Sequence, residues 1–209
     1  MKNKSTLFDD GHVLPLVEDF YTIQGEGFHS GKPAYFIRVG GCDVGCNWCD
    51  VKISWNPNIH PATQTDDIVK NALKNPSKAV VVTGGEPFIY QLDYLCSELK
   101  KHGISTFIET SGSHSHSGQW DWICLSPKKK KPPLEPIFKL ASELKVVIEK
   151  DLDFAWAEEN RKKVSPQCKL YIQPEWSAYE AIIGPITDYV MQHPDWNISL
   201  QSHKFMHIP

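Results

Sequence analysis

Three cysteines within one short loop constrain this chain more than any other feature of its sequence. Cys42, Cys46 and Cys49 form a CxxxCxxC pattern in a loop that also contains three glycines. Glycines let a backbone wrap closely around a bulky inorganic group, and thiolates suit zinc or an iron–sulfur cluster. Because structural zinc sites and most iron–sulfur clusters take four protein ligands, three cysteines leave one iron open to an external ligand. The spacing alone favours an open-iron cluster over zinc or unmetallated thiols.

Composition narrows the class of protein. The chain has 209 residues, 41% hydrophobic and 22% charged, which is typical of a folded globular protein. We expect one domain, residues 1–209, because no repeat or low-complexity linker interrupts the sequence. The net charge of −3 gives no overall attraction to nucleic acid, and no apolar run approaches the ~20 residues of a membrane helix. The first residues do not resemble a signal peptide, so we expect a cytoplasmic protein.

Three other features have ordinary structural interpretations. The remaining cysteines lie in apolar segments and are expected to be core residues: Cys96, Cys124 and Cys168. His114 and His116 lie in a Ser/Gly-rich segment that we interpret as a flexible loop and only weakly as a metal site. Lys129–Lys131 have no interleaved aromatic residues, so we expect a solvated loop and no nucleic-acid partner.

Eight short runs rich in Val, Ile, Phe and Tyr predict β-strands. They are Leu16–Tyr21, Ala34–Val39, Ala79–Thr83, Ser105–Glu109, Trp122–Leu125, Leu144–Ile148, Leu170–Gln173 and Trp196–Leu200. Helical patterns lie between them. These are Asp66–Lys74 with Thr65 as its cap, Gln91–Lys101 ending near Gly103, Leu152–Lys163, and Tyr179–Gln192 interrupted by Gly184 and Pro185.

Strands that alternate with helices predict an α/β fold with a mostly parallel sheet. The run Ala79–Thr83 is apolar up to its end, as expected where helices cover both faces of the sheet. A closed barrel of eight βα units takes about 250 residues. The chain is shorter than that, so we expect an incomplete (β/α) barrel.

Polar residues and glycines of a kind often found in ligand sites lie at or just after the carboxyl ends of four predicted strands. They are Gly84–Glu86, Glu109–Gly112, Ser126–Lys128 and Gln173–Glu175. Ligand sites of parallel sheets gather at the carboxyl ends of the strands. In the first of these segments, bare amides at the two glycines and the Glu86 carboxylate could bind the amino group of an amino-acid-like cofactor.

The cysteine pattern with Trp48 before the last cysteine, together with Gly84-Gly85-Glu86-Pro87, resembles the signature of the radical S-adenosylmethionine (SAM) superfamily. The resemblance implies that the three cysteines hold a [4Fe–4S] cluster whose open iron is chelated by SAM. Reduction then gives a 5′-deoxyadenosyl radical that abstracts hydrogen from the substrate, so no side chain of the protein is expected to be the reactive group.

Further motifs in order along the chain resemble the 7-carboxy-7-deazaguanine synthase family, from about Glu18 to the last residue. They are Phe20–Gly27, Arg38, Glu109–Gly112, Ser126–Lys128, Gln173-Pro174 and Gln201–Pro209. That family converts 6-carboxy-5,6,7,8-tetrahydropterin to 7-carboxy-7-deazaguanine with loss of ammonia, in queuosine and 7-deazapurine biosynthesis. The resemblance also implies a homodimer and an electron donor such as flavodoxin or ferredoxin.

The resemblance assigns residues to two ligands. Expected substrate contacts are Ile23, Gln24, Gly25, Arg38, Thr83 and Pro209. Expected SAM contacts are Gly85, Glu86, Ser126, Pro127, Lys128, Gln173, Pro174, Glu175 and Trp176. Two residues stay open: Glu109 is either a ligand contact or a solvated acid, and His203 is either functional or packed.

The chain departs from the family at one position. The family has Thr or Ser after Cys-Asp, and that hydroxyl helps to bind Mg²⁺, whereas Val51 follows Asp50 here and offers no oxygen. Mg²⁺ prefers oxygen ligands. Asp50 or Ser54 could compensate, so the resemblance implies Mg²⁺ while the residues do not supply its usual ligand.

Two other functions are consistent with parts of this pattern. A glycyl-radical activating enzyme shares the cysteine loop but acts on a protein partner, and it lacks the Thr22–Gly27 segment and the C-terminal motif. A zinc-stabilised binding module would need only the cysteines and would have no affinity for SAM. A simple electron-transfer protein has no use for an open iron or for the Gly-Gly-Glu-Pro segment.

Overall fold

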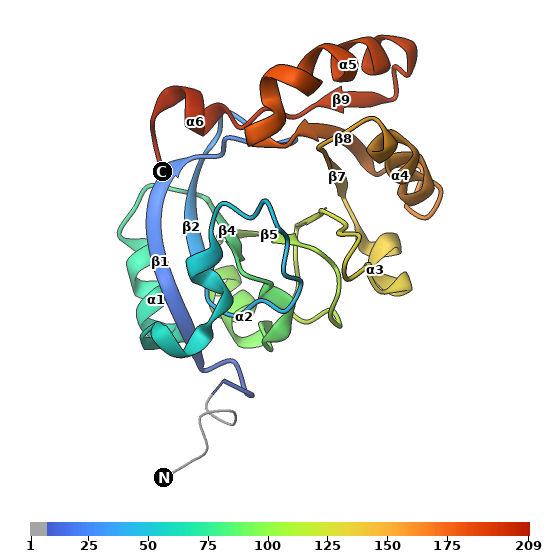
Figure 1. Ribbon diagram of the computed structural model, residues 1–209. Helices are drawn as coiled ribbons and strands as arrows, with labels where there is room; N and C mark the ends of the chain where they lie inside the picture. The colour runs from blue at the N-terminus through green and yellow to red at the C-terminus, as the bar shows by residue number, and fades with distance from the viewer. Residues whose placement is uncertain (1–7) are drawn as a thin grey trace.

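The computed structural model describes residues 8–209, so residues 1–7 of the expected domain lie outside the described part. The described residues form a nine-stranded sheet in the order β3-β1-β2-β4-β5-β6-β7-β8-β9. The strands are β1 (Val13–Ile23), β2 (Pro33–Val39), β3 (Ala62–Gln64), β4 (Ala79–Gly84), β5 (Ser105–Thr110), β6 (Trp122–Leu125), β7 (Glu143–Ile148), β8 (Lys169–Pro174) and β9 (Trp196–Ile198). Because β3 and β9 are its two edges, the curved sheet is not closed, which confirms the predicted incomplete barrel (Figure 1).

Strand direction follows from the connections. From β2 to β9 every neighbouring pair is parallel, whereas β1 is antiparallel to both β2 and β3. A loop without a helix joins β1 to β2, and such short connections suit antiparallel pairs, while parallel pairs need longer crossovers. All eight predicted strands are present. The three-residue β3 was not predicted, because it is too short to show an alternating pattern.

Apart from the short C-terminal helix, the helices lie around the outside of the curved sheet (Figure 1). They are α1 (Thr65–Leu73), α2 (Asp93–Lys101), α3 (Glu135–Leu140), α4 (Leu152–Arg161), α5 (Tyr179–Gln192) and α6 (Ser202–Met206), with 3₁₀ turns η2 (Lys52–Trp55), η3 (Pro57–Ile59), η4 (Pro87–Ile89) and η5 (Trp176–Ala178). The main hydrophobic core includes apolar residues of both sheet and helices, among them Ile37, Leu95 and Trp196. Apolar burial of this kind is the main stabilising contribution to the fold.

The central strand β4 is buried on both faces, as its apolar sequence predicts, but helices do not cover both. Val80 and Val82 belong to the main core. Val81, on the opposite face, packs in a second cluster with Phe36, against which Phe20 is packed. Since the sheet is curved, its concave face is filled by side chains of its own strands, and the expectation of helices on both faces is wrong.

Two local expectations about helices are also wrong. Thr65 does not cap α1 with its side chain; it is the first helical residue, fully buried, and its hydroxyl donates to the Gly11 carbonyl at 2.7 Å. Helix α5 continues through Gly184 and Pro185 without a break. Buried Ile182 and Ile186 fix the helix on the core on either side of the proline, which outweighs the lost backbone hydrogen bond.

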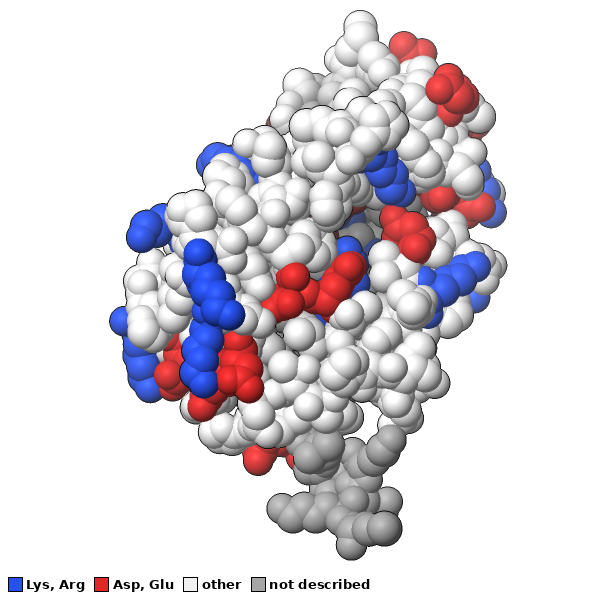
Figure 2. Space-filling view, turned by 90° about the vertical axis from the view of Figure 1, so that its left-hand side faces the viewer, with Lys and Arg blue, Asp and Glu red and all other residues white. Residues whose placement is uncertain are grey.

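Charged residues of both signs are interspersed on the face of the molecule that Figure 2 shows. This mixed pattern agrees with the small net charge of −3. No helix of residues 8–209 is long and apolar enough to cross a membrane.

Candidate active site

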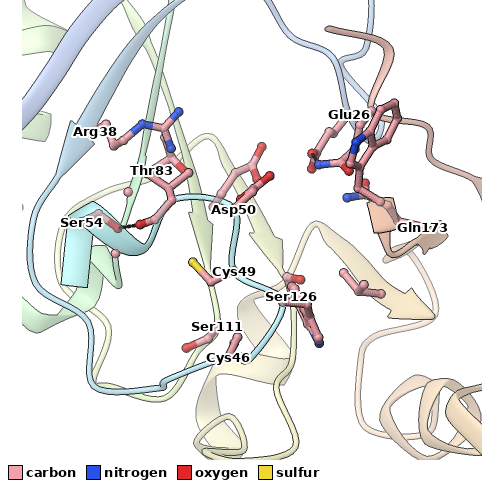
Figure 3. A pocket seen from close by; sticks show the side chains of 18 of the residues that line it. Glu26, Arg38, Cys46, Cys49, Asp50, Ser54, Thr83, Ser111, Ser126 and Gln173 are labelled. Atoms are coloured by element: carbon pink, nitrogen blue, oxygen red, sulfur yellow. Dashed lines mark hydrogen bonds between the residues drawn. The ribbon is translucent and has the colours of Figure 1, made fainter. Parts of the chain in front are cut away.

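A cavity of about 560 Å³ opens at the carboxyl-terminal ends of the parallel strands. Side chains from distant segments point into it, including Arg38 of β2, Thr83 of β4 and Gln173 of β8 (Figure 3). Ligand pockets for small molecules have volumes of roughly 300–1,000 Å³. Every site residue predicted from the sequence lines this cavity except Pro127, which is buried beside it.

The cysteine loop crosses one side of the cavity between β2 and η2. Cys42, Cys46 and Cys49 are half-buried free thiols that line the cavity. The amides of Gly41 and Cys42 donate to carbonyls of η2, at 2.6 Å to Ser54 and 3.1 Å to Trp55. The backbone of the loop is therefore fixed by the structure around it.

Glycines allow the turn after β4 to pack directly against this loop. A Cβ on Gly85 would lie 2.1 Å from the Gly41 carbonyl oxygen and 3.0 Å from Cβ of Cys42. The Gly85 amide donates to the Val39 carbonyl at 2.9 Å, and the Glu86 amide donates to the Gly41 carbonyl at 2.8 Å. The Gly85 amide thus joins the turn to β2 and the Glu86 amide joins it to the cysteine loop, so the expectation of a bare glycine amide facing a cofactor is wrong for Gly85.

The Glu86 carboxylate joins this turn to the end of β5. It is fully buried and accepts hydrogen bonds from the hydroxyls of Thr110 and Ser111. It also accepts from the amides of Ser111 at 2.7 Å and Phe88 at 3.1 Å. Because both of its oxygens are bonded within the protein, the carboxylate links the turn after β4 to η4 and to the end of β5.

The lysine run after β6 holds the cysteine loop from the other side. Lys128 Nζ lies 5.6 Å from the centroid of the Trp48 ring, and it donates to the hydroxyl and carbonyl oxygens of Ser126 at 2.6 Å. Lys130 Nζ donates to the carbonyl of Gly45 and to the side chain of Asn47, both at 2.7 Å.

The neighbouring lysines are paired as well. Lys131 contacts Asp43 at 2.6 Å and His114 at 2.9 Å, and Lys129 pairs with the buried Asp153. Lys129 and Lys130 are exposed and Lys131 is partly exposed, so the predicted solvated loop is confirmed, although all three lysines are also paired. His114 is held by Asp43 and Lys131. His116 is exposed and contacts the Phe88 ring edge to face.

The opposite side of the cavity contains the predicted substrate contacts. Gln24 is buried and donates through Nε2 to Glu109 at 2.9 Å. His203 packs on Gly25, where a Cβ would lie 2.2 Å from His203 Nδ1. Burial lowers the pKa of His203, which favours the neutral imidazole. Glu109 is therefore not a solvated acid, and His203 is a packed residue that also lines the cavity.

The C-terminus lies at the end of β1 (Figure 1). The Thr22 hydroxyl donates to the Pro209 carbonyl oxygen at 3.3 Å. Arg38 is 19% exposed and bonds Glu18 through Nε at 2.7 Å. Two expected substrate contacts, Arg38 and Pro209, are thus held by residues of β1.

The segment after β8 forms the far wall. Gln173 accepts from the Ser199 hydroxyl at 2.7 Å, and Glu175 caps η5 by accepting from the amides of Ser177 and Ala178. Trp176 remains 40% exposed, with Phe205 of α6 packed against it at 5.3 Å between ring centroids. An exposed indole of this kind offers an aromatic face on which a purine base can stack.

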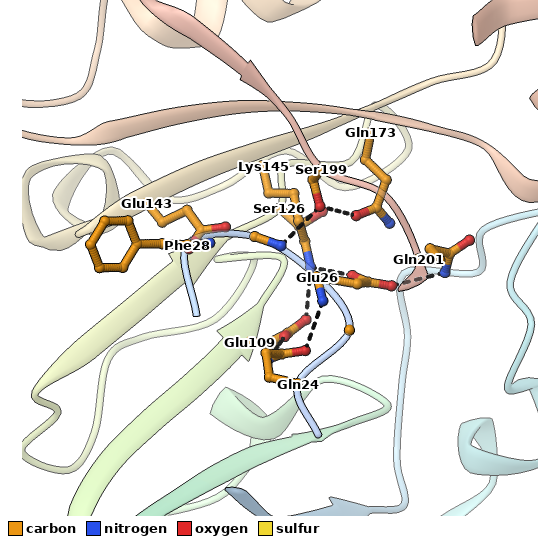
Figure 4. A network of polar contacts seen from close by, with 12 residues as sticks. Gln24, Glu26, Phe28, Glu109, Ser126, Glu143, Lys145, Gln173, Ser199 and Gln201 are labelled. Atoms are coloured by element: carbon orange, nitrogen blue, oxygen red, sulfur yellow. Dashed lines mark hydrogen bonds and ion pairs between the residues drawn. The ribbon is translucent and has the colours of Figure 1, made fainter. Parts of the chain in front are cut away.

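Sequence reasoning missed a charged network in the floor of the cavity. Lys145 of β7 is 4% exposed and pairs with Glu26 and, at 3.0 Å, with Glu109 (Figure 4). Both Lys145 and Glu26 line the cavity. The available signal was a lysine inside the apolar run Leu144–Ile148, where a cation is stable only when it is paired.

The residues around the Mg²⁺ position do not fit a hard cation. Val51 offers no side-chain oxygen, Asp50 pairs with Lys204 at 3.0 Å, and the Ser54 hydroxyl donates to the Val51 carbonyl at 2.7 Å. The Asp50 carboxylate is therefore already paired with a cation, and the Ser54 hydroxyl is already bonded to a backbone carbonyl. Among residues 8–209, no group of three or more His, Cys, Asp or Glu side chains, the three cysteines included, is arranged to hold a single metal ion.

An iron–sulfur cluster fits the cysteine loop better. Its three thiols come from one glycine-containing loop and line the same cavity, and burial raises the pKa of Cys42 and Cys46. A bound metal offsets the cost of ionising such thiols. With three protein ligands the loop leaves a coordination position for a small molecule in the adjoining cavity.

Comparisons with known proteins give a consistent result. Residues 36–125 match the model of the radical SAM superfamily. The chain is 53% identical to the 7-carboxy-7-deazaguanine synthase of Flavobacterium psychrophilum, over 96% of this chain and 95% of that protein. It is 46% identical to the Synechocystis protein of the same name, over 92% of each. The crystal structure of QueE from Escherichia coli matches with a TM-score of 0.78 and 28% identity, covering 96% of this chain and 99% of that one.

Proposed function

The chain belongs to the 7-carboxy-7-deazaguanine synthase family of the radical SAM superfamily, and from that premise we propose its reaction. It converts 6-carboxy-5,6,7,8-tetrahydropterin to 7-carboxy-7-deazaguanine with loss of ammonia, a step of queuosine and 7-deazapurine biosynthesis. One observation carries the proposal: a single cavity gathers the three cysteines and the residues expected to bind both ligands.

Cys42, Cys46 and Cys49 would hold the [4Fe–4S] cluster. When bound, the cluster and SAM supply the radical that abstracts hydrogen from the substrate. The chain positions these groups. The absence of a side chain at Gly85 lets the turn after β4 pack against the cysteine loop, and the positive charge of Lys128 favours the Cys46 thiolate. Trp176 offers its face to the adenine, and Ser126, Gln173 and Glu175 shape the wall between the two.

Arg38, Gln24 and Thr83 would orient the pterin. Glu18 holds Arg38 through Nε, and a guanidinium fork binds a carboxylate through two parallel hydrogen bonds. Gln24 is fixed by Glu109, so its amide is presented in one orientation. Fixed orientation of the reacting groups is the main contribution a protein can make to radical chemistry started by a cofactor.

Helix α6 would exclude water from the reaction. Its His203 packs on Gly25 at the substrate side, and its Phe205 packs on Trp176 at the SAM side. A cover that touches both walls keeps quenching groups away from a radical.

We leave Mg²⁺ out of the proposed mechanism, because the residues around Val51 do not fit it. We further propose that flavodoxin or ferredoxin reduces the cluster, and that the protein acts as a homodimer in the cytoplasm. The family resemblance supports these assignments. Size-exclusion chromatography with light scattering tests the dimer.

The experiment that tests the reaction is anaerobic turnover. The cluster is reconstituted and reduced, SAM and 6-carboxytetrahydropterin are added, and the product is followed by mass spectrometry beside a Cys46→Ala control. Product from the native protein alone supports the proposal. A brown protein that cleaves SAM without this product would contradict the substrate. A colourless zinc protein without SAM cleavage would indicate a binding module.

A further inference from the structure

A buried lysine occupies the floor of the cavity beneath the expected substrate position. Lys145 lies within β7, in a run that is otherwise apolar, and its side chain is 4% exposed. Titratable groups from several elements surround it: Glu26 before β2, Glu109 of β5, Cys124 of β6, Lys128 after β6 and Glu143 of β7. A lysine in such a place persists only with good partners.

Two of these groups, Glu26 and Glu109, are bonded to Lys145 and also line the cavity (Figure 4). A second donor fixes each of them: Gln201 Nε2 bonds Glu26 at 2.8 Å, and Gln24 Nε2 bonds Glu109 at 2.9 Å. A carboxylate has about four acceptor positions. Each therefore keeps acceptor capacity beyond its bonds within the protein.

Lys145 carries the positive charge between the two carboxylates. Burial alone lowers the pKa of Lys145, but the surrounding carboxylates raise it well above its usual value, so the ammonium is charged. Burial raises the pKa of Glu26, yet its ion pair with Lys145 outweighs this and lowers it to about 2. Burial raises the pKa of Glu143, so this carboxyl group carries less negative charge than an exposed glutamate does. At the cavity surface Lys145 thus faces two carboxylates, while a second cation there, Lys128, is bonded to Ser126.

We propose that Lys145 is a positioning residue that holds the Glu26 and Glu109 carboxylates side by side, and that this pair selects substrates whose ring edge presents adjacent N–H donors. The inference rests on the proposed function and deepens it, because the 2-amino-4-oxopyrimidine edge of a pterin has such donors. N–H groups from a ligand satisfy carboxylates that the protein leaves partly unpaired.

The specificity follows from the free-energy cost of binding a ring that lacks these N–H donors. A ring without the exocyclic amino group would leave acceptor positions of a carboxylate unfilled beneath it, and sites built around hydrogen bonds reject such analogues strongly. Lys145 itself contacts no ligand in this scheme. Its effect is to hold two like charges together, which would otherwise repel each other.

The test measures binding to cluster-loaded, unreduced protein in the presence of SAM, by anaerobic calorimetry. The probes are 6-carboxytetrahydropterin and its analogue with hydrogen in place of the 2-amino group. We expect native protein to prefer the amino compound by about 100-fold. Lys145→Met and Glu109→Gln should each weaken binding of the amino compound by about tenfold and lower this preference to about tenfold or less, while SAM affinity changes less than about twofold.

Lys100→Met is the matched control, because Lys100 pairs with Asp121 at 3.2 Å on helix α2, outside the cavity, and should leave both affinities unchanged. If Lys145→Met does not fold, Glu109→Gln decides, since it keeps the side-chain shape and the Lys145–Glu26 pair. A native preference that persists in folded variants overturns the inference but not the function. Native protein that neither binds nor converts the pterin overturns the proposed function itself.

Discussion

The ammonium group of Lys204 lies 3.0 Å from the Asp50 carboxylate, so helix α6 is joined to the end of the cysteine loop. The same ammonium lies 4.9 Å above the centroid of the Trp176 ring. One side chain of the C-terminal helix thus contacts both the loop that would hold the cluster and the expected adenine platform. It also gives Asp50 a cationic partner within the protein, in the region where the family binds Mg²⁺.

Turnover by the native protein should be insensitive to Mg²⁺, because Val51 supplies no oxygen and Asp50 is already paired. Val51→Thr adds a hydroxyl and should make the rate rise severalfold with added Mg²⁺. Initial rates after chelation, measured across a Mg²⁺ titration, check this. Val51→Ala is the control, since it changes the side chain without adding an oxygen. Identical titrations for native and Val51→Thr proteins would count against the prediction.

Much of the site could be predicted from the sequence because of one property of parallel sheets. Residues at the carboxyl ends of parallel strands, such as Thr83, Glu109, Ser126 and Gln173, must meet at one edge of the sheet. That rule needs only the strand assignments, and long apolar runs such as Ala79–Thr83 give those reliably. It does not say which side of a turn faces the cavity, so Pro127 was included although it is buried.

Contacts between distant segments could not be predicted. Lys130 bonds Gly45 and Asn47, 85 and 83 residues earlier in the chain, and no local pattern marks such a pair. The role of Lys145 depends in the same way on Glu26 and Glu109. The short helices α3 and α6 were missed because they span six and five residues, too few for helical periodicity to show.

Gly85→Ala should prevent cluster assembly. The new methyl group would lie 2.1 Å from the Gly41 carbonyl oxygen, which is backbone and cannot move without displacing Cys42. We expect most of the iron and sulfide to be lost after reconstitution, measured by metal analysis and by the brown absorbance.

Gly184→Ala is the matched control, because nothing lies within 4 Å of its added Cβ. It should load the cluster normally and gain up to about 1 kcal/mol of stability from better helix propensity. Equal iron content in the two variants would mean that the cysteine loop tolerates the displacement.

Glu86→Gln should destabilise the protein by about 2–4 kcal/mol, because the amide replaces an anion that accepts several buried hydrogen bonds. Urea unfolding measures the change, with calorimetry for SAM binding. The exposed Glu135, 3.4 Å from Lys163, provides a control whose replacement by Gln should cost less than about 0.5 kcal/mol. Loss of SAM affinity at unchanged stability would instead make Glu86 a direct ligand.

Acid should destabilise the protein through Glu26. Burial raises the pKa of this group, but Lys145 lowers it from 4.5 to about 2 in the folded protein. The unfolded chain therefore binds a proton near its ordinary pKa of 4.5 while the folded protein does not. The stabilisation is complete above that pH and is lost as the pH falls toward 2; its size is of the order of 3 kcal/mol.

Urea unfolding of native protein and Glu26→Gln across this pH range isolates the contribution, since the other carboxylates are common to both. The native protein should lose more stability than the variant between pH 4.5 and 2. Gln keeps the side-chain volume and a hydrogen-bonding oxygen, so a stability difference that grows as the pH rises reports the charge. Parallel pH profiles for the two proteins would show that the Lys145 pair does not control the ionisation of Glu26.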